Sequence, residues 1–178
     1  MEFMMLVLGL ASGPQQLPTT LEALRAAVAA PAVETSSVQQ LTIRWEAYSS
    51  PADALVAPAA AARLDEFQLL ARTVVEGTAV RERNPELSAD RLVIVLTDAQ
   101  GAVRYWSSIP DPRIVRAEQP GPDGVLTGVT LHRRQADFLL ALPNISAAAQ
   151  VRIYEPHWDG NEWTLDQVGA VTMPAAAR

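Results

Sequence analysis

The amino-acid sequence predicts a mostly-β protein, an antiparallel β-sandwich with one short N-terminal helix. Through the second half of the chain, short segments rich in β-branched and aromatic residues alternate with clusters of turn residues. Turns rather than helices join these segments, so a parallel sheet is not expected. Hydrophobic residues make up 49% of the 178-residue chain, which is enough to bury a core and argues against wholesale disorder.

A short amphipathic helix is expected over residues 20–30. Thr19 and Glu22 have the spacing of a capping box, in which each of two side chains satisfies a free backbone N–H of the other residue. Pro31 ends the helical pattern, and residues 14–37 as a whole are expected to form the helix and a linker. The apolar residues of this segment recur at the spacing of one helix face: Leu21, Leu24 and Val28.

Residues 1–13 form an apolar segment with two interpretations. The run from Phe3 to Leu10 has the length of a signal-peptide core, although Glu2 stands where basic residues usually precede such a core. The alternative is a buried first strand or helix. The run is too short to span a bilayer, so no transmembrane span is predicted. An extracytoplasmic location (periplasmic or secreted) and a cytoplasmic location are equally open.

Residues 38–174 are expected to form the sandwich domain. Apolar residues occupy every second position of Leu41–Tyr48, which indicates a strand with one buried face. Leu92–Leu96 is apolar throughout, which indicates a strand buried on both faces. The other expected strands are 103–106, one that begins near 114, 125–131, 138–142, 151–158, 162–165 and 168–173.

Two turns and one ambiguous segment complete this outline. Asp98–Gly101 is expected to be a hairpin turn in which the glycine adopts a positive φ. A polar turn, Arg133–Asp137, is expected between two of the strands. Residues 52–76 fit the periodicity of a helix and of a strand; we expect a helical turn over 58–65 and a strand over 66–76.

Seven to nine strands at this spacing are typical of an immunoglobulin-like or fibronectin-III-like sandwich. The likeness lies in the strand pattern alone, because the chain has no cysteine and therefore lacks the Cys–Trp–Cys signature of antibody domains. No segment of 20–50 residues repeats, which excludes a propeller or a solenoid. This architecture carries many unrelated functions, so the fold class does not name an activity.

The C-terminal hairpin, Val151–Leu165, gathers most of the aromatic side chains that a ligand could contact. A two-residue loop at Gly160-Asn161 would place Trp158 opposite Trp163, with Tyr154 on the same face. Cross-strand aromatic pairs commonly stabilise hairpins by packing. The alternative is an exposed platform that stacks on a sugar or on a partner protein. The candidate ligand-binding residues are therefore Tyr154, Trp158 and Trp163.

The opposite face of this hairpin carries polar residues. Glu155, His157 and Asp166 could bind a divalent cation through carboxylate oxygens and imidazole. Glu155 and Asp166, which face each other in the expected register, could also act as an acid–base pair. The alternative is a solvated polar face on an acidic protein. The spacing matches no known calcium-loop or zinc-site pattern.

Several classes of function are disfavoured by what the sequence lacks. There is no cysteine nucleophile, no Gly-x-Ser-x-Gly elbow, no glycine-rich phosphate loop and no zinc-binding pattern. The net charge is −6 and the arginines are scattered, whereas nucleic acid binding needs a clustered basic surface. No catalytic residue, no cofactor and no nucleic acid partner are predicted.

These observations predict a non-catalytic binding or accessory module that mediates a protein interaction. All 14 basic residues are arginine, and together with the many alanines this indicates a GC-rich bacterial genome. The first alternative is a carbohydrate-binding module that uses the aromatic face of the C-terminal hairpin. The second is a metal-dependent enzyme at the tip of the same hairpin.

Overall fold

The computed structural model describes residues 19–27, 35–47, 65–79, 86–121 and 124–174. The apolar segment 1–13 lies outside these ranges, as does the helical turn expected over 58–65, apart from Asp65. Within the described ranges the chain forms one helix and nine strands: α1 (Leu21–Ala27), β1 (Ser37–Glu46), β2 (Glu66–Glu76), β3 (Arg91–Asp98), β4 (Val103–Pro110), β5 (Ile114–Pro120), β6 (Leu126–His132), β7 (Gln135–Pro143), β8 (Ala148–Trp158) and β9 (Trp163–Thr172).

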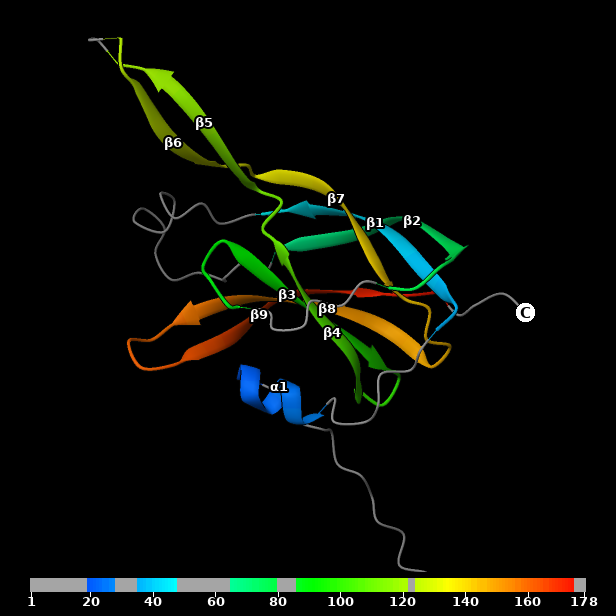
Figure 1. Cartoon of the computed structure of the whole chain (residues 1–178). Coiled ribbons are helices and arrows are strands. Elements are labelled where there is room, and N and C mark those ends of the chain that lie inside the picture. Colours follow the sequence, from blue (N-terminus) through cyan, green and yellow to red (C-terminus); the bar gives the residue numbers. More distant parts are fainter. Residues whose placement is uncertain (1–18, 28–34, 48–64, 80–85, 122–123, 175–178) are drawn as a thin grey trace, which may run out of the picture.

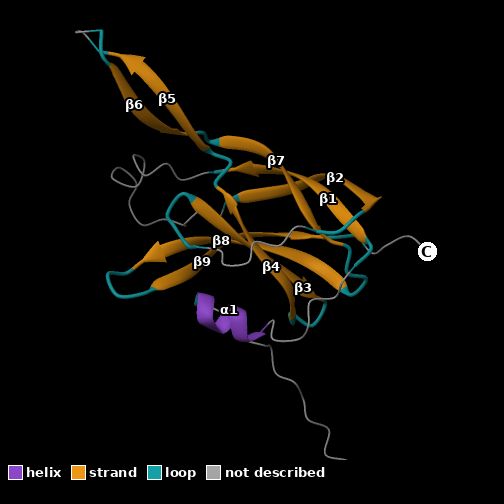
Figure 2. Cartoon of the chain, viewed as in Figure 1, coloured by secondary structure: helices purple, strands orange, loops and turns teal. Residues whose placement is uncertain are grey.

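The strands form three antiparallel sheets, which confirms the prediction of a mostly-β, antiparallel fold. The first sheet has the order β2–β1–β7, the second has the order β4–β3–β8–β9, and β5 pairs with β6 in a separate ribbon. The two larger sheets lie face to face, and α1 lies on the outer side of the four-stranded sheet (Figures 1 and 2). The β5–β6 ribbon projects from the end of this layered body (Figure 1).

The core between the two larger sheets is built from alternate positions of their strands. The predicted one-sided burial of the first strand is confirmed, because Leu41, Ile43 and Trp45 of β1 are fully buried while the residues between them are partly exposed. The expected strand over 66–76 is observed as β2, whose Phe67 and Leu69 pack against the same core. Facing side chains come from the second sheet: Leu92, Ile94, Leu96, Val151, Ile153 and Val171.

β3 is buried on both faces, as its unbroken apolar sequence predicts. Leu92, Ile94 and Leu96 point into the core between the sheets. Val93 and Val95 point the other way, into a second cluster that α1 closes with the fully buried Leu24. The helix therefore stabilises a strand that is apolar on both faces. Without it, Val93 and Val95 would face water on the outer side of the sheet.

The helix begins one residue later than the sequence predicts. Thr20, not Thr19, caps α1, because its hydroxyl oxygen accepts a hydrogen bond from the backbone N–H of Ala23 at 3.2 Å. Thr19 is used differently: its carbonyl oxygen accepts a hydrogen bond of 2.8 Å from the N–H of Leu165 on β9. With Thr20 as the cap, the third helical residue is Ala23 rather than Glu22, so the capping box of Thr19 and Glu22 is not formed.

The segments expected on either side of the polar turn Arg133–Asp137 belong to different sheets. β6 pairs with β5, whereas β7 pairs with β1, and only Arg133 and Arg134 separate β6 from β7. Backbone hydrogen bonds of the two arginines hold the chain where it passes from the ribbon strand β6 to the sheet strand β7. The N–H of Arg133 donates to the carbonyl of Arg113, and the carbonyl of Arg134 accepts from the N–H of Ala47. Similarly, the segments expected over 162–165 and 168–173 form one continuous strand, β9.

The turn between β3 and β4 is the hairpin turn that the sequence predicts. Gly101 has a φ of 85°, in the region that favours glycine, and its N–H donates to the carbonyl of Asp98 at 3.0 Å. The carboxylate of Asp98 is buried and accepts hydrogen bonds from the N–H groups of Gln100 and Ala102 and from the Arg104 guanidinium. Burial alone would raise the pKa of Asp98, but these donors together hold that pKa below its usual value.

A first prediction concerns Gly169, where β9 passes close to β2. A β-carbon at this position would overlap the ring of Phe67, which is itself stacked on Trp45 with ring centroids 4.8 Å apart. We expect Gly169→Ala to lower the free energy of unfolding by about 1–3 kcal/mol, the usual cost of overpacking. Urea unfolding checks this, with Gly128→Ala as the control, since a β-carbon at Gly128 meets nothing within 4 Å. Equal effects of the two substitutions would contradict the predicted overlap with the Phe67 ring.

A second prediction concerns the pH dependence of stability. Because the pKa of Asp98 is lower in the folded chain than in the unfolded one, its charged form stabilises the fold above the unfolded pKa of about 4. That stabilisation is lost as the pH falls through the folded pKa. We expect Asp98→Asn to lower the free energy of unfolding by about 1–2 kcal/mol at pH 7. The difference from the wild type should shrink as the pH falls from about 4 through the lower folded pKa. A difference that stays constant from pH 7 to pH 3 would show that the charge of Asp98 is not involved.

Candidate functional site

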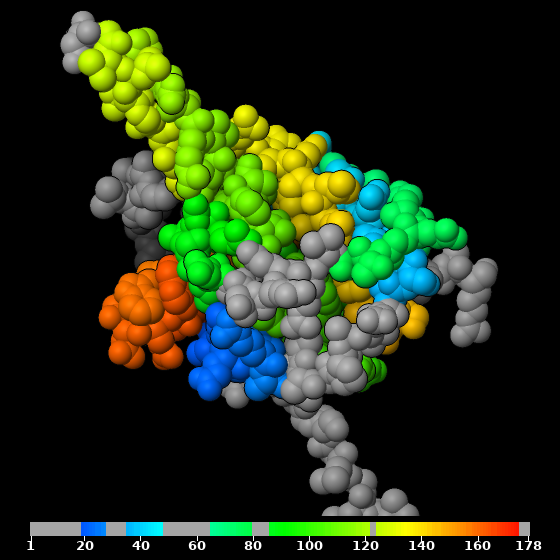
Figure 3. Space-filling model, in the orientation of Figure 1, coloured from blue at the N-terminus to red at the C-terminus, as the bar shows by residue number. Residues whose placement is uncertain are grey.

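The ribbon of β5 and β6, called the arm from here on, has no buried residue along either strand. It extends away from the body in the space-filling view (Figure 3). Cross-strand partners share a face of the ribbon, and the register pairs Val115 with Leu131 and Ala117 with Val129. These four residues give the arm one apolar face. The other face is mixed: it carries Arg116, Glu118, Thr130 and His132 together with Ile114, Pro120, Leu126 and Gly128.

Large apolar side chains of the arm are open to solvent. Leu131 on the apolar face is 48% exposed, and Val125 and Leu126 near the tip are both 61% exposed. A two-stranded ribbon on its own is at best marginally stable in water. Such a ribbon with uncovered leucine side chains is typical of a surface that another chain covers.

The arm is anchored at its root by Arg113. The guanidinium of Arg113 donates to the carboxylate of Asp111 at 2.8 Å and to that of Glu155 on β8 at 2.5 Å, and it lies 3.9 Å from a carboxylate oxygen of Asp65. It also lies over the ring of Trp45, 3.6 Å from the ring centroid. Since Trp45 belongs to the three-stranded sheet and Glu155 to the four-stranded sheet, one side chain connects the arm to both layers of the sandwich.

The environment of Arg113 keeps its positive charge fixed. The side chains of Arg113 and Asp111 are only 15% and 5% exposed. Burial by itself lowers the pKa of Arg113, but the carboxylates of Asp111 and Glu155 outweigh that effect, and the pKa is raised above its ordinary value. The indole N–H of Trp45 donates to Asp65 at 2.8 Å and so orients a second carboxylate of the cluster. The root of the arm is therefore held by ionic contacts at every pH at which the carboxylates are charged.

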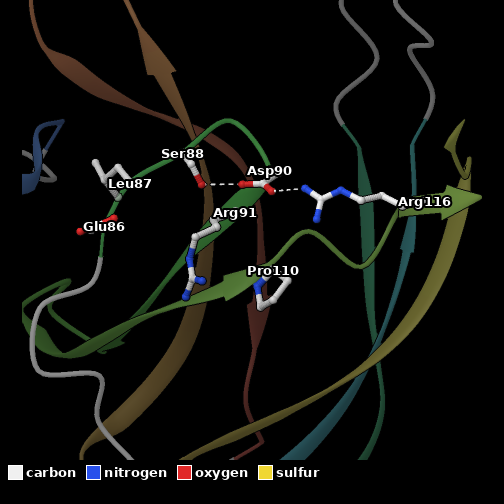
Figure 4. A pocket seen from close by; sticks show the side chains of 7 residues that line it. All are labelled: Glu86, Leu87, Ser88, Asp90, Arg91, Pro110 and Arg116. Carbon is white, nitrogen blue, oxygen red and sulfur yellow. Dashed lines mark hydrogen bonds and ion pairs between the residues drawn. The ribbon is translucent and has the colours of Figure 1, made fainter. Parts of the chain in front are cut away.

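A polar pocket of about 580 Å³ lies between the root of the arm and the start of β3 (Figure 4). Arg116 of the arm donates to Asp90 at 2.6 Å, and Asp90 also accepts a hydrogen bond from Ser88. The hydroxyl of Ser88 and the guanidinium of Arg116 hold the pKa of Asp90 below its usual value. Both signs of charge line the pocket, so its electrostatics select neither an anion nor a cation. The lining residues are Glu86, Leu87, Ser88, Asp90, Arg91, Pro110 and Arg116.

The register predicted for the C-terminal hairpin is confirmed. Trp158 pairs with Trp163, and Glu155 pairs with Asp166. The structure nevertheless separates the three aromatic candidates. Tyr154 is buried, 2% exposed, in the cluster beneath α1, whereas Trp158 is 49% exposed at the tip. The two tryptophan rings are 5.5 Å apart and inclined by 55°, so they pack against each other as a tilted pair and do not form a flat platform.

The polar candidates of the hairpin are also divided among different environments. Glu155 is engaged by Arg113, while His157 and Asp166 are exposed to solvent. Among the described residues, no group of three or more His, Cys, Asp or Glu side chains is arranged to hold a metal ion. Glu155 and Asp166 remain cross-strand partners, but the carboxylate of Glu155 serves the anchor of the arm.

Comparison with known proteins finds no matching family model, no matching curated protein and no matching solved structure. In the part of the chain that the structure describes, no helix is long and apolar enough to cross a membrane. The arm and its anchor are the candidate functional site.

Sequence reasoning identifies the strands of the arm but does not show that they form a ribbon separate from the two larger sheets. The alternation of Val115 and Ala117 on one strand, and of Val129 and Leu131 on the next, is a usable signal for a ribbon with one apolar face. The contacts of Arg113 cannot be predicted from local sequence, because its partners lie far away along the chain. Glu155 is 42 residues from Arg113, and Asp65 lies just before β2.

A third prediction tests the anchor. We expect Arg113→Met to lower the free energy of unfolding by about 2–3 kcal/mol, because it leaves the buried carboxylate of Asp111 without its cation. The matched control is Arg44→Met, which removes an exposed ion pair to Asp137 of the same 2.8 Å length. That substitution should have little effect, since exposed ion pairs contribute little to stability. Urea unfolding measures both, and an Arg44→Met effect as large as that of Arg113→Met would contradict the prediction.

Proposed function

We propose that this protein is a non-catalytic binding or accessory module that engages a protein partner through the arm. The observation that carries the proposal is the combination of a projecting two-stranded ribbon, exposed leucine side chains on it and a rigid ionic anchor at its root. An anchored ribbon presents its apolar face in a fixed orientation, which lowers the entropy lost on binding. A partner that covers the arm would gain about 1.5–3 kcal/mol for each large apolar side chain that becomes fully buried.

An apolar β-ribbon suits a protein partner better than a small ligand. Its side chains lie on an open surface, whereas small-molecule sites are concave and enclose most of the ligand. A ribbon edge can also offer backbone groups to an incoming strand, a common mode of peptide and protein recognition. The bacterial source and the export of the protein stay proposals that rest on composition and on the apolar segment 1–13.

The immunoglobulin-like or fibronectin-III-like description is also part of the proposal. It is supported by the four-stranded sheet, where the last two strands of the chain, β8 and β9, follow β3 as the F and G strands follow strand C. The three-stranded sheet differs, because its first strand, β1, lies in the middle, whereas immunoglobulin domains have their first strand at an edge. We therefore propose a sandwich that shares one sheet order with these domains.

A carbohydrate-binding function is the second proposal, and the exposed Trp158 is the observation in its favour. One exposed ring can stack on one sugar. The buried Tyr154 and the inclination between Trp158 and Trp163 weigh against a longer stacking surface. A metal-dependent enzyme at the hairpin tip has less support, because the Glu155 carboxylate is already bound by a guanidinium.

A fourth prediction tests the proposed function. Leu131→Asp places a charge on the apolar face of the arm, while Leu139→Asp places the same charge on β7, where the leucine is 59% exposed. We expect proteins captured by the wild-type chain from extracts of its source cells to be captured by Leu139→Asp and lost with Leu131→Asp. Each captured protein is then purified and its affinity measured by calorimetry, with an expected loss of at least about tenfold for the arm variant.

Unchanged urea unfolding and circular dichroism for both variants would show that the body is intact. The proposal fails if Leu131→Asp and Leu139→Asp capture the same proteins with the same affinities. It also fails if the captured proteins do not bind the purified wild-type chain.

A further inference from the structure

The two edges of the arm differ in a way that points to how it pairs. Within the described residues, β5 and β6 pair only with each other, so each has one outer edge. β5 carries Arg116, Glu118 and Pro120, and charges and prolines are the usual devices that prevent an edge strand from pairing. β6 has the sequence Leu-Thr-Gly-Val-Thr-Leu-His, without any acidic residue, arginine, lysine or proline. Only the β6 edge is left open to another strand.

We propose that β6 pairs with β6 of a second copy of this chain, antiparallel and centred on Val129. This inference rests on the proposed function and names its partner as the chain itself. In this register Val129 faces Val129 of the second copy, and Gly128 faces Thr130. Thr127 faces Leu131, so no charged residue of β6 meets a like charge across the two-fold axis.

The distribution of charge on the chain favours the arm as the meeting point. The whole chain has a net charge of −6, which opposes the approach of two copies. Residues 114–132 contain one basic residue, Arg116, and two acidic residues, Glu118 and Asp123, so their net charge is only −1. Because the arm projects from the body, two copies that meet at their arms keep the remaining charge apart. Solution ions screen charges beyond about 8–10 Å.

The pairing would also correct the weakness of a lone ribbon. Two arms joined at β6 form one sheet of four strands, and three or more strands with an apolar face are what independent stability requires. The apolar faces of the two arms then become continuous, with Val115, Ala117, Val129 and Leu131 of each copy on one side. A contact limited to one seven-residue strand per copy falls below about 1,200 Å². We therefore expect a dimer that dissociates on dilution.

The absence of cysteine from the chain makes this register directly testable. Directly opposed residues of antiparallel strands have their Cα atoms about 4.5–5.5 Å apart, which is within the range that a disulfide spans. Val129→Cys should therefore give a disulfide-linked dimer under mild oxidation. The matched control is Ala117→Cys, because Ala117 is the cross-strand partner of Val129 on the same face of the arm. In the proposed dimer the two copies of residue 117 are three strand spacings, about 14 Å, apart.

A second pair of variants tests the same contact without covalent chemistry. Val129→Lys places two like charges against each other at the two-fold axis, while Ala117→Lys places the same charge on the protected strand. Sedimentation of the purified full chain over about 5–200 µM should show the wild type and Ala117→Lys shifting toward dimer. The dimer dissociation constant of Val129→Lys should be at least about tenfold higher.

The inference is overturned if the wild type stays monomeric across this range and Val129→Cys forms no linked dimer. It is also overturned if Val129→Cys and Ala117→Cys are linked to the same extent, since that outcome indicates face-to-face contact or random collision. Neither result contradicts the proposed function if Leu131→Asp abolishes binding to a purified partner. A dimer with the predicted linkage, combined with no other arm-dependent partner, would support self-association as the use of the arm.

Discussion

The guanidinium of Arg113 lies where three parts of the molecule meet: the three-stranded sheet through Trp45, the four-stranded sheet through Glu155, and the arm, which it immediately precedes. Arginine suits this place because its planar group donates several hydrogen bonds in fixed directions and can also lie on an aromatic ring. A buried cation is costly unless carboxylates compensate it, and here Asp65, Asp111 and Glu155 do so. This cluster ties the root of the arm to both larger sheets.

The core of the body is complete without the arm. Side chains from both larger sheets fill the space between them, and α1 closes the outer side of the four-stranded sheet with Leu24. The exposed Val125, Leu126 and Leu131 belong to neither cluster. Exposed apolar residues that add nothing to the core lower the solubility of a protein. A contact with another chain would cover them and so offset that cost. This division between a closed core and an exposed arm is what supports the proposed binding role.

The sequence predicts correctly those features that depend on neighbouring residues or on a regular pattern of apolar positions. The unbroken apolar run of β3 predicts burial on two faces, and the loop at Gly160-Asn161 sets the register that pairs Trp158 with Trp163. It could not tell that Tyr154 is buried and Trp158 exposed, because alternation gives the face of a strand and not how far α1 covers that face. The partners of β6 and of Arg113 were beyond its reach, since they depend on which distant segments the fold brings together.

The two ends of the arm leave and re-enter the body at neighbouring points, since the N–H of Arg133 donates to the carbonyl of Arg113 at 2.9 Å. The strand before the arm, β4, belongs to the four-stranded sheet, and the strand after it, β7, belongs to the three-stranded sheet. A segment joined in this way can change in length or sequence while the sandwich strands keep their order, as surface insertions at close-ended sites generally can. The arm could therefore be exchanged for a ribbon of another sequence or length without rebuilding the two larger sheets.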